Sequence, residues 1–275
     1  MTQASNDGPM RAEIVIPARY QSSRYPGKPL AALTGATGIA KPLIQRSLEA
    51  ARQVQGVATV HIATDDPRIE EAVRGFGGSV IMTPASCANG TERVAAALHG
   101  LHDETDIIIN FQGDALLTPP ALVEQLIDHM RSDPACEAAT VAVRCSPSAY
   151  RHLIADQAAG RVGGTTAVLD ASGNALYFSK RVLPHIPPGH AAEQDPPVLL
   201  HLGLYAYRRS ALERYIAWPE TELERIEGLE QLRFLVYGTP LHVVRADPPD
   251  WDTIELNNPS DKAPIEAILK SRSII

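Results

Sequence analysis

Short apolar strands alternate with amphipathic helical segments through the first half of this 275-residue chain, and this alternation limits the folds that the chain can adopt. Five strands are predicted, at residues 13–17, 59–63, 79–82, 107–111 and 138–143. The helices predicted between them cover residues 41–53, 67–75, 90–100 and 119–132. They begin near Pro or a capping residue and end near Gly. Such alternation indicates an α/β fold with a mainly parallel sheet flanked by helices.

The second half of the chain has a different pattern. Strands are predicted at residues 165–169, 175–178 and 199–207, with a hairpin-like turn over residues 170–174. The Pro-rich segment 185–197 is predicted to be a loop, and residues 258–270 a helix. We expect these strands to extend the same sheet in antiparallel fashion. Residues 12–275 would then form a single domain after a flexible tail at residues 1–11.

Bulk properties exclude several classes of protein. A net charge of −7 and a pI near 5.7 argue against nucleic-acid binding. No apolar run approaches the ~20 residues of a membrane span, so no membrane association is expected. Cys87, Cys136 and Cys145 lack metal-ligand spacing and indicate reduced thiols in a cytoplasmic protein. The glycine-rich dinucleotide and P-loop motifs, the nucleophile elbow and HExxH are all absent from the sequence.

The strongest functional signal is the segment 14–30, IVIPARYQSSRYPGKPL. It places Arg19, Arg24 and Lys28 in a loop that follows the first apolar strand. Residues 11–30 contain four cations and one anion, although the chain as a whole is acidic. Guanidinium groups and backbone N–H groups suit phosphate oxygens, which predicts a polyphosphate site. A solvated basic loop is the alternative interpretation.

Other polar segments follow the predicted strands. In the sequence NFQGD, Asp114 stands at the carboxyl end of a buried strand, where one or two carboxylates could bind Mg²⁺ together with substrate phosphates. In NGTER, a helix N-terminus at Asn89 and Gly90 could hold a polar group of a ligand. A turn aspartate and an ordinary capped helix are the alternatives.

The segment ERIEGLEQLR, residues 224–233, contains a run of charged and amide side chains. Glu227, Glu230, Gln231 and Arg233 recur at helical i, i+3 and i+4 spacing. They form either a solvated, salt-bridged face or a row of hydrogen-bonding groups for a polyhydroxylated substrate.

Taken together, seven segments resemble, in the same order, the 3-deoxy-manno-octulosonate (Kdo) cytidylyltransferases, also called CMP-Kdo synthetases. They are IPARYQSSRYPGKPL, ATDDPRI, NGTERV, NFQGD, ALYFSK, HLGLYAYRR and LEQLR. The resemblance implies a nucleotide-diphospho-sugar transferase-like fold and a homodimer built through the antiparallel half. The implied reaction is Mg²⁺-dependent transfer of CMP from CTP to a 2-keto-3-deoxy acid sugar, with release of pyrophosphate, in lipopolysaccharide biosynthesis.

The resemblance also implies roles for individual residues. The catalytic group would be Arg19, Arg24 and Lys28, which hold the triphosphate, and Asp114, which binds Mg²⁺. The cytidine side would be lined by Ala18, Thr64, Asn89, Gly90 and Gln112. The acid sugar would be bound by His201, Tyr205, Glu227, Glu230 and Gln231, with Lys180 near its carboxylate.

The sequence departs from the family's pattern at several of these positions. Lys180 stands for an arginine that would grip a carboxylate with two hydrogen bonds, and Asn89 stands for a serine. Ala115 and Leu116 replace Glu-Pro after QGD, and residues 163–168 lack a lysine.

The position of the family's second metal-binding aspartate aligns with Asn257, whereas a shifted register would place Asp252 there. These departures fit an enzyme for a different acid, such as an amino-substituted acid sugar, another nonulosonate-type acid or a phosphonate. They also fit a CTP-binding protein that has lost turnover.

Overall fold

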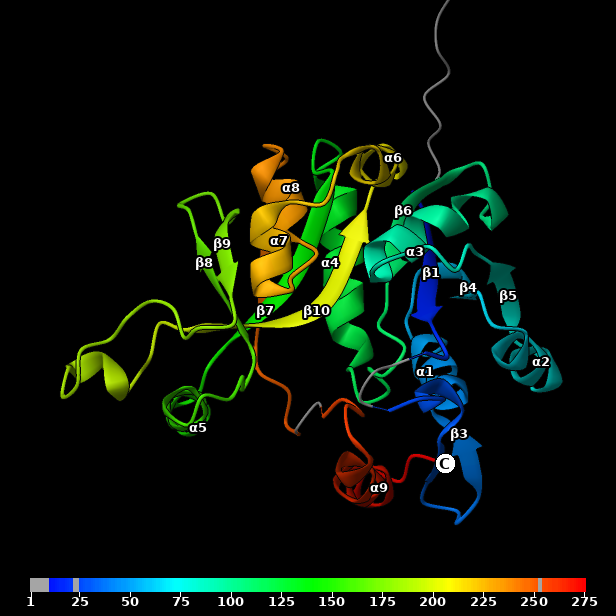
Figure 1. Cartoon of the computed structure of the whole chain (residues 1–275), viewed down its shortest axis with the longest axis horizontal. Helices are drawn as coiled ribbons and strands as arrows, with labels where there is room; N and C mark the ends of the chain where they lie inside the picture. The colour runs from blue at the N-terminus through cyan, green and yellow to red at the C-terminus, as the bar shows by residue number, and fades with distance from the viewer. Residues whose placement is uncertain (1–9, 22–24, 252–253) are drawn as a thin grey trace, which may run out of the picture.

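The computed structural model describes residues 10–21, 25–251 and 254–275 and is built around one mixed sheet (Figure 1). Its strands follow the order β11-β7-β10-β6-β1-β4-β5, with β8 beside β10 and β9 beside β8. The bounds along the main path are β1 (Arg11–Ala18), β4 (Val57–Thr64), β5 (Ser79–Met82), β6 (Thr105–Asn110), β7 (Ala138–Arg144), β10 (Leu199–Tyr207) and β11 (His242–Ala246). Strand β10 is antiparallel to β6 and β7, and the other neighbours on this path are parallel. The predicted mainly parallel sheet is confirmed.

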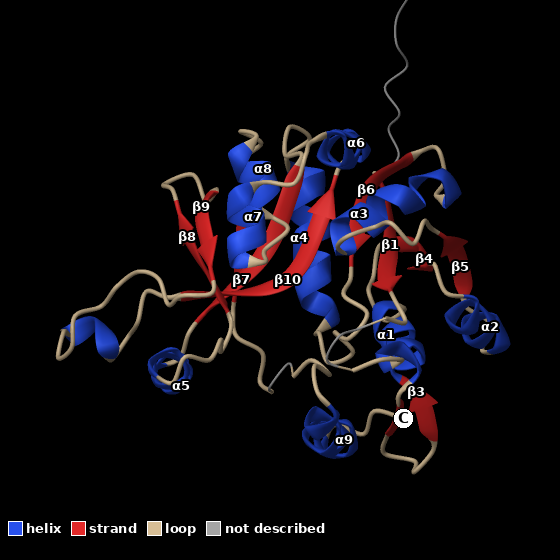
Figure 2. Cartoon of the chain, viewed as in Figure 1, coloured by secondary structure: helices blue, strands red, loops and turns tan. Residues whose placement is uncertain are grey.

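Helices cover both faces of the sheet (Figure 2). On one face lie α1 (Leu43–Ala51), α2 (Pro67–Gly75) and α4 (Pro120–Ser132), and on the other α3 (Gly90–Ala96), α6 (Arg209–Ala217) and α8 (Leu232–Val236). Neighbouring β1 side chains point to opposite faces, so that Ile14 packs in the first core and Val15 in the second. Burial on both faces explains why the parallel strands read as continuous apolar runs. Within the described ranges, no helix has the length and apolar character needed to cross a membrane.

The antiparallel part consists of β10 and the hairpin of β8 (Thr165–Leu169) and β9 (Ala175–Ser179). The predicted turn is present. The Asp170 carboxylate accepts hydrogen bonds from the backbone N–H groups of Ser172 and Asn174 at 2.8 and 2.9 Å. The aspartate side chain thus provides acceptors for backbone N–H groups of the turn, which is why an Asx-type sequence favours the hairpin.

Some boundaries and elements differ from the sequence-based expectations. The helix expected from residue 41 begins at Leu43, because residues 41 and 42 belong to β3 (Ala40–Pro42), which pairs with β2 (Ala32–Thr34). The helix α5 (Pro147–Ala158) was not predicted, nor were α6 and β11. The Pro-rich loop contains one 3-10 turn, Ala191–Glu193, and the last helix, α9 (Lys262–Ser271), follows another at Pro259–Asp261.

A bulge interrupts β10 at the centre of the molecule. His201 pairs with Ala142 of β7 and Tyr205 pairs with Thr140, so four steps along β10 match two steps along β7. Gly203, inside the bulge, has a φ of +65°, which favours glycine. Bulges re-aim side chains next to functional sites. This one lies between His201 and Tyr205, two residues that the sequence associates with substrate.

Candidate active site

A cavity of about 1300 Å³ lies at the carboxyl ends of β1 and β6. Twelve of the residues singled out from the sequence line it: Ala18, Arg19, Lys28, Asn89, Gly90, Gln112, Asp114, His201, Tyr205, Glu230, Gln231 and Asn257. Arg24 and Asp252 lie outside the described residues. The position agrees with the rule that open α/β sheets bind ligands beyond the carboxyl ends of their strands.

At one end of the cavity, the Lys28 ammonium forms an ion pair with the Asp114 carboxylate. The segment that carries Asp114 is packed tightly on β1. A Cβ on Gly113 would lie 2.8 Å from the carbonyl oxygen of Pro17, so only glycine fits. Ser47 of α1 donates to the Gly113 carbonyl at 2.8 Å. The backbone therefore fixes the cationic loop and the carboxylate side by side.

His201 is held in one hydrogen-bonding state on the cavity wall. Its Nε2 lies 2.8 Å from Thr140 Oγ1, and that hydroxyl donates its proton to the Leu204 carbonyl at 2.7 Å. The Nε2 must then carry the ring proton, which leaves Nδ1 as an acceptor. Burial lowers the pKa of His201 to about 3, so the ring is neutral. A substrate group bound to Nδ1 must donate, as a hydroxyl does.

The depressed pKa of His201 predicts a pH dependence of stability. An unfolded histidine has a pKa of about 6.5, so below that pH the unfolded chain takes up a proton that the folded chain refuses. The contribution of His201 to the free energy of unfolding is therefore complete above pH 6.5 and decreases as the pH falls towards 3. When the pH falls from 7.5 to 5, the unfolding free energy of the unmodified protein should decrease. In His201→Gln this decrease should be smaller by about 2 kcal/mol. Urea denaturation at both pH values measures this difference.

The control for this measurement is His185→Gln, at an exposed position in the Pro-rich loop. It should follow the unmodified protein at both pH values. Equal losses in the His201→Gln and unmodified proteins would contradict a neutral imidazole with a lowered pKa at this position.

Gln231 and Glu230 form the next part of the wall. The Gln231 side chain accepts a hydrogen bond from the Tyr205 hydroxyl at 3.2 Å, and the residue is only 2% exposed. Its Nε2 has no partner among the described residues, although a buried unpaired donor is costly. Glu230 accepts from the N–H of Thr91 at 3.2 Å, at the start of α3, and burial raises its pKa. Gln231 Nε2 is therefore a buried donor without a partner among the described residues, next in sequence to the Glu230 carboxylate.

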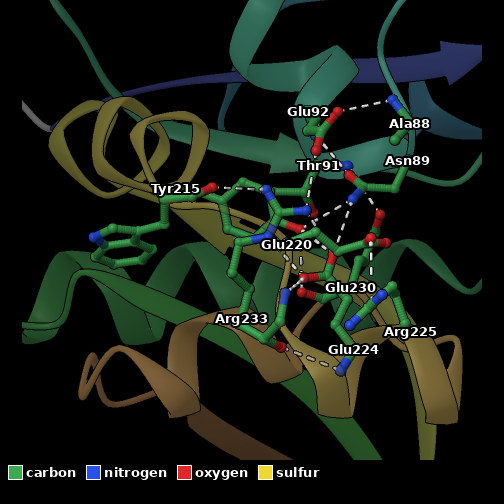
Figure 3. A network of polar contacts seen from close by, with 12 residues as sticks. Ala88, Asn89, Thr91, Glu92, Tyr215, Glu220, Glu224, Arg225, Glu230 and Arg233 are labelled. Carbon is green, nitrogen blue, oxygen red and sulfur yellow. Dashed lines mark hydrogen bonds and ion pairs between the residues drawn. The ribbon is translucent and has the colours of Figure 1, made fainter.

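A buried polar network joins the two walls of the cavity (Figure 3). The Arg233 side chain, 3% exposed, donates to both Glu224 oxygens at 2.6 and 2.8 Å and to Glu92 at 3.0 Å. Its guanidinium carbon also lies 4.2 Å from the centre of the Tyr215 ring. Asn89 caps α3 by accepting from the N–H of Glu92 at 2.8 Å, and it donates to the Tyr215 hydroxyl. The network fixes the start of α3 against residues 224–233.

The prediction of one helical row over residues 224–233 is wrong. The helix α7 (Glu222–Glu227) ends at Gly228, which has a φ of +60°, and α8 begins only at Leu232. Glu227 consequently points away from Glu230 and accepts from Ser179 Oγ at 2.8 Å and from the N–H of Lys180 at 3.0 Å. Arg233 serves the buried network described above.

Three of the residues implied by the resemblance are not on the cavity wall. They are Thr64, Lys180 and Glu227. Thr64 is fully buried, and its hydroxyl accepts from the N–H of Asp66 at 3.2 Å. Lys180 lies directly behind the wall, because its ammonium is 2.8 Å from the place of a Cβ on Gly228, which does line the cavity.

The cavity also contains residues that sequence reasoning missed. Arg93, 3% exposed, donates to Thr83 Oγ1 at 2.8 Å and pairs with Asp65 at 2.9 Å. Its place in NGTER, one turn into α3, was the available signal. Glu255 lines the cavity two residues before Asn257, in an irregular segment whose sequence gave no periodic signal.

The residues present fit a divalent cation that also binds substrate phosphates. Asp114, Glu255 and Asn257 line the same cavity, and the Asn257 Nδ2 lies 3.3 Å from a Glu255 oxygen. Across the described residues, no group of three His, Cys, Asp or Glu side chains could hold a metal by itself. Mg²⁺ does not require one, since it typically takes one or two carboxylates together with phosphate and water oxygens.

Comparisons with known proteins agree over nearly the whole chain. A family model described as cytidylyltransferase matches residues 14–243. The 3-deoxy-manno-octulosonate cytidylyltransferase of Maricaulis maris (strain MCS10) is 41% identical over 255 residues, which cover 93% of this chain and 95% of that protein. The 8-amino-3,8-dideoxy-manno-octulosonate cytidylyltransferase of Shewanella baltica (strain OS155 / ATCC BAA-1091) is 40% identical over 255 residues, covering 92% and 96%.

A solved structure gives the same result. The chain superimposes on CMP:2-keto-3-deoxy-manno-octonic acid synthetase complexed with CTP with a TM-score of 0.80 and 38% sequence identity. The match covers 95% of this chain and 99% of that one. Fold and sequence thus point to the same family.

Proposed function

The chain belongs to the family of 3-deoxy-manno-octulosonate cytidylyltransferases, and from this premise we propose that it transfers CMP from CTP to Kdo or a close analogue and releases pyrophosphate. The observation that carries the proposal is the shared cavity. It contains the cations Arg19 and Lys28, the Asp114 carboxylate and the polar wall around His201. A triphosphate and a polyhydroxylated acid therefore have adjoining places.

In the proposed reaction, the anomeric hydroxyl of the sugar attacks the α-phosphorus of CTP. The new bond joins that oxygen to phosphorus, the bond from the α-phosphorus to the bridging oxygen breaks, and pyrophosphate leaves with the electron pair. The hydroxyl proton is released to solvent. Arg19 and Lys28 stabilise the charge on the departing pyrophosphate, with Arg24 of the same loop as a third cation.

A divalent cation belongs to this proposal. Asp114 would hold Mg²⁺ together with the Asn257 amide oxygen, and Glu255 supplies a carboxylate beside that amide. When bound, Mg²⁺ supplies charge neutralisation for the phosphates. Because the Asn257 amide is neutral, Asp114 and Glu255 are the carboxylates proposed to balance the charge of the cation.

The sugar is recognised by groups of fixed hydrogen-bonding character. His201 Nδ1 accepts from a sugar hydroxyl, and Gln231 Nε2 donates to a sugar oxygen. Lys180, behind Gly228, provides a positive charge near the sugar carboxylate. Thr64 and Glu227 support the walls from behind.

An amino-substituted acid sugar is a second candidate substrate. It is supported by the 40% identity to a relative named for an 8-amino-3,8-dideoxy sugar, over almost the full length of both chains.

Pyrophosphate release from CTP and Mg²⁺ tests both candidates. We expect release that depends on the acid, with Kdo or its 8-amino analogue giving the higher kcat/KM, and no release in an acid-free control. If CTP bound and no acid supported release, the transfer reaction would be disproved for this chain. Recovery of release in Asn257→Asp would then assign the loss of turnover to the metal site.

A homodimer and a cytoplasmic location are part of the same proposal. Leu176 of β9 and Ile226 of α7 are 60% and 74% exposed, and these apolar side chains lie on the antiparallel half that would form the dimer interface. Sedimentation equilibrium tests it, because the mass of a single chain would contradict the dimer. The free thiols of Cys87, Cys136 and Cys145 suit a reducing compartment.

A further inference from the structure

The ion pair between Lys28 and Asp114 occupies the carboxylate that the proposed function needs for metal. Both side chains are partly buried, with exposed fractions of 20% for Lys28 and 15% for Asp114. Lysine carries only donors, so its ammonium occupies the Oδ2 oxygen of Asp114 and repels a divalent cation that approaches the same carboxylate. As long as the pair is intact, a cation approaching Asp114 meets a positive charge.

The two partners differ in their freedom to move. Asp114 follows Gly113, which is wedged against the Pro17 carbonyl and held by the Ser47 hydroxyl. Lys28 begins a 3-10 turn after Gly27, whose φ is +72°. Its backbone is therefore also fixed, but its four-carbon side chain can turn to another acceptor. Release of the pair thus depends on giving the ammonium a different anion.

A triphosphate provides that anion in the same cavity. Arg19 lines the same cavity, and the N–H of Gly27 donates to the Tyr20 carbonyl at 2.9 Å, which brings the backbones next to Arg19 and Lys28 together. Phosphate oxygens in this cavity are attracted by both cations. Without phosphates, a divalent cation at Asp114 would take the anion with which Lys28 pairs, and the two cations would repel each other. With phosphates present, Lys28 and the metal no longer share an acceptor.

We propose that Lys28 makes metal binding dependent on nucleotide: its ammonium occupies Asp114 in the nucleotide-free protein, and the triphosphate draws it away. This inference rests on the proposed function and extends it to the order of binding. Because coupling between two ligands is reciprocal, Mg²⁺ should strengthen nucleotide binding by the same factor. The nucleotide-free protein is thereby kept from binding a metal ion that it cannot use.

Mn²⁺ binding to the nucleotide-free protein tests the inference, measured from the electron paramagnetic resonance signal of the free ion. Lys28→Met should bind one Mn²⁺ at least tenfold more tightly than the unmodified protein, and Lys28→Met with Asp114→Asn should lose that gain. Lys41→Met is the matched control. It removes a lysine paired with Glu49 at 2.9 Å, outside the cavity, and should leave Mn²⁺ affinity unchanged.

Equal Mn²⁺ affinity in the Lys28→Met and unmodified proteins would overturn the inference, provided that both melt at similar temperatures. Lys28→Gln repeats the test if the methionine variant unfolds. If Lys28 served only to bind phosphate, Lys28→Met would have the same Mn²⁺ affinity as the unmodified protein in the absence of nucleotide. The measurement involves neither CTP nor acid, so its result is separate from that of the pyrophosphate assay.

Discussion

Replacing Asp114 by asparagine should reduce acid-dependent pyrophosphate release by about a thousandfold or more in kcat/KM. The amide keeps the size of the side chain but removes the negative charge that would hold the divalent cation. Metal stabilisation of transition-state charge is worth several kcal/mol, and each 1.36 kcal/mol is a factor of ten in rate. Steady-state kinetics with CTP and the acid would measure this loss.

The fold should survive this change, because Asp114 is on the cavity wall and not in the hydrophobic core. The matched control is Asp106→Asn, near the start of β6, the strand that precedes Asp114, where the carboxylate accepts from the N–H of Arg11. It should retain full activity. Activity within tenfold of the unmodified enzyme in Asp114→Asn would remove Asp114 from the metal site.

Replacing Arg233 by methionine should be the most destabilising of the changes considered. It would leave Glu224 buried without its cation and remove the contact with Glu92. Breaking a buried ion pair from one side typically costs about 3–5 kcal/mol. Urea denaturation at neutral pH would measure the loss. The KM for the acid should rise as well, because Arg233 holds the segment that carries Glu230 and Gln231.

Two further variants test whether the loss of stability in Arg233→Met comes from the uncompensated buried charge of Glu224. Arg214→Met removes an arginine paired with Glu137 at the surface, where both side chains are about 40% exposed, and should cost less than about 1 kcal/mol. Adding Glu224→Gln to Arg233→Met should recover part of the stability, since the uncompensated buried charge is gone. A loss of under 1 kcal/mol in Arg233→Met would contradict the network's structural role.

The parallel half of the fold could be predicted because each of its strands and helices is indicated by its own local sequence. The apolar runs that became β1, β4, β5, β6 and β7 are short and bounded by turn signals, which favours strands, and the carboxyl ends of parallel strands share one sheet edge. That rule alone brought Arg19, Lys28 and Asp114 together. The identity of the nucleotide and of the acid came from the family resemblance, because no spacing rule distinguishes one base or one sugar from another.

Other features were hidden because they depend on distant contacts. The letters of residues 224–233 fit one helix, and only the left-handed Gly228 divides it. Arg93 was not singled out, and Arg233 was assigned either to a solvated face or to a substrate-binding row. Both are buried, and each pairs with a carboxylate far away in the sequence. The bulge at Gly203 depends on the register of β10 against β7, which is set by tertiary pairing.

The place of β10 in the sheet has a consequence for the order in which the molecule is built. Strands β6 and β7 follow one another in the sequence, yet β10 lies between them in the sheet. It begins at Leu199, and 54 residues separate it from the end of β7. A ribosome-bound chain that has emerged only as far as α5 therefore carries two strands whose facing edges have no partner, a condition that favours aggregation. The active site is completed only when β10 enters this gap, so both halves of the cavity become joined late in synthesis.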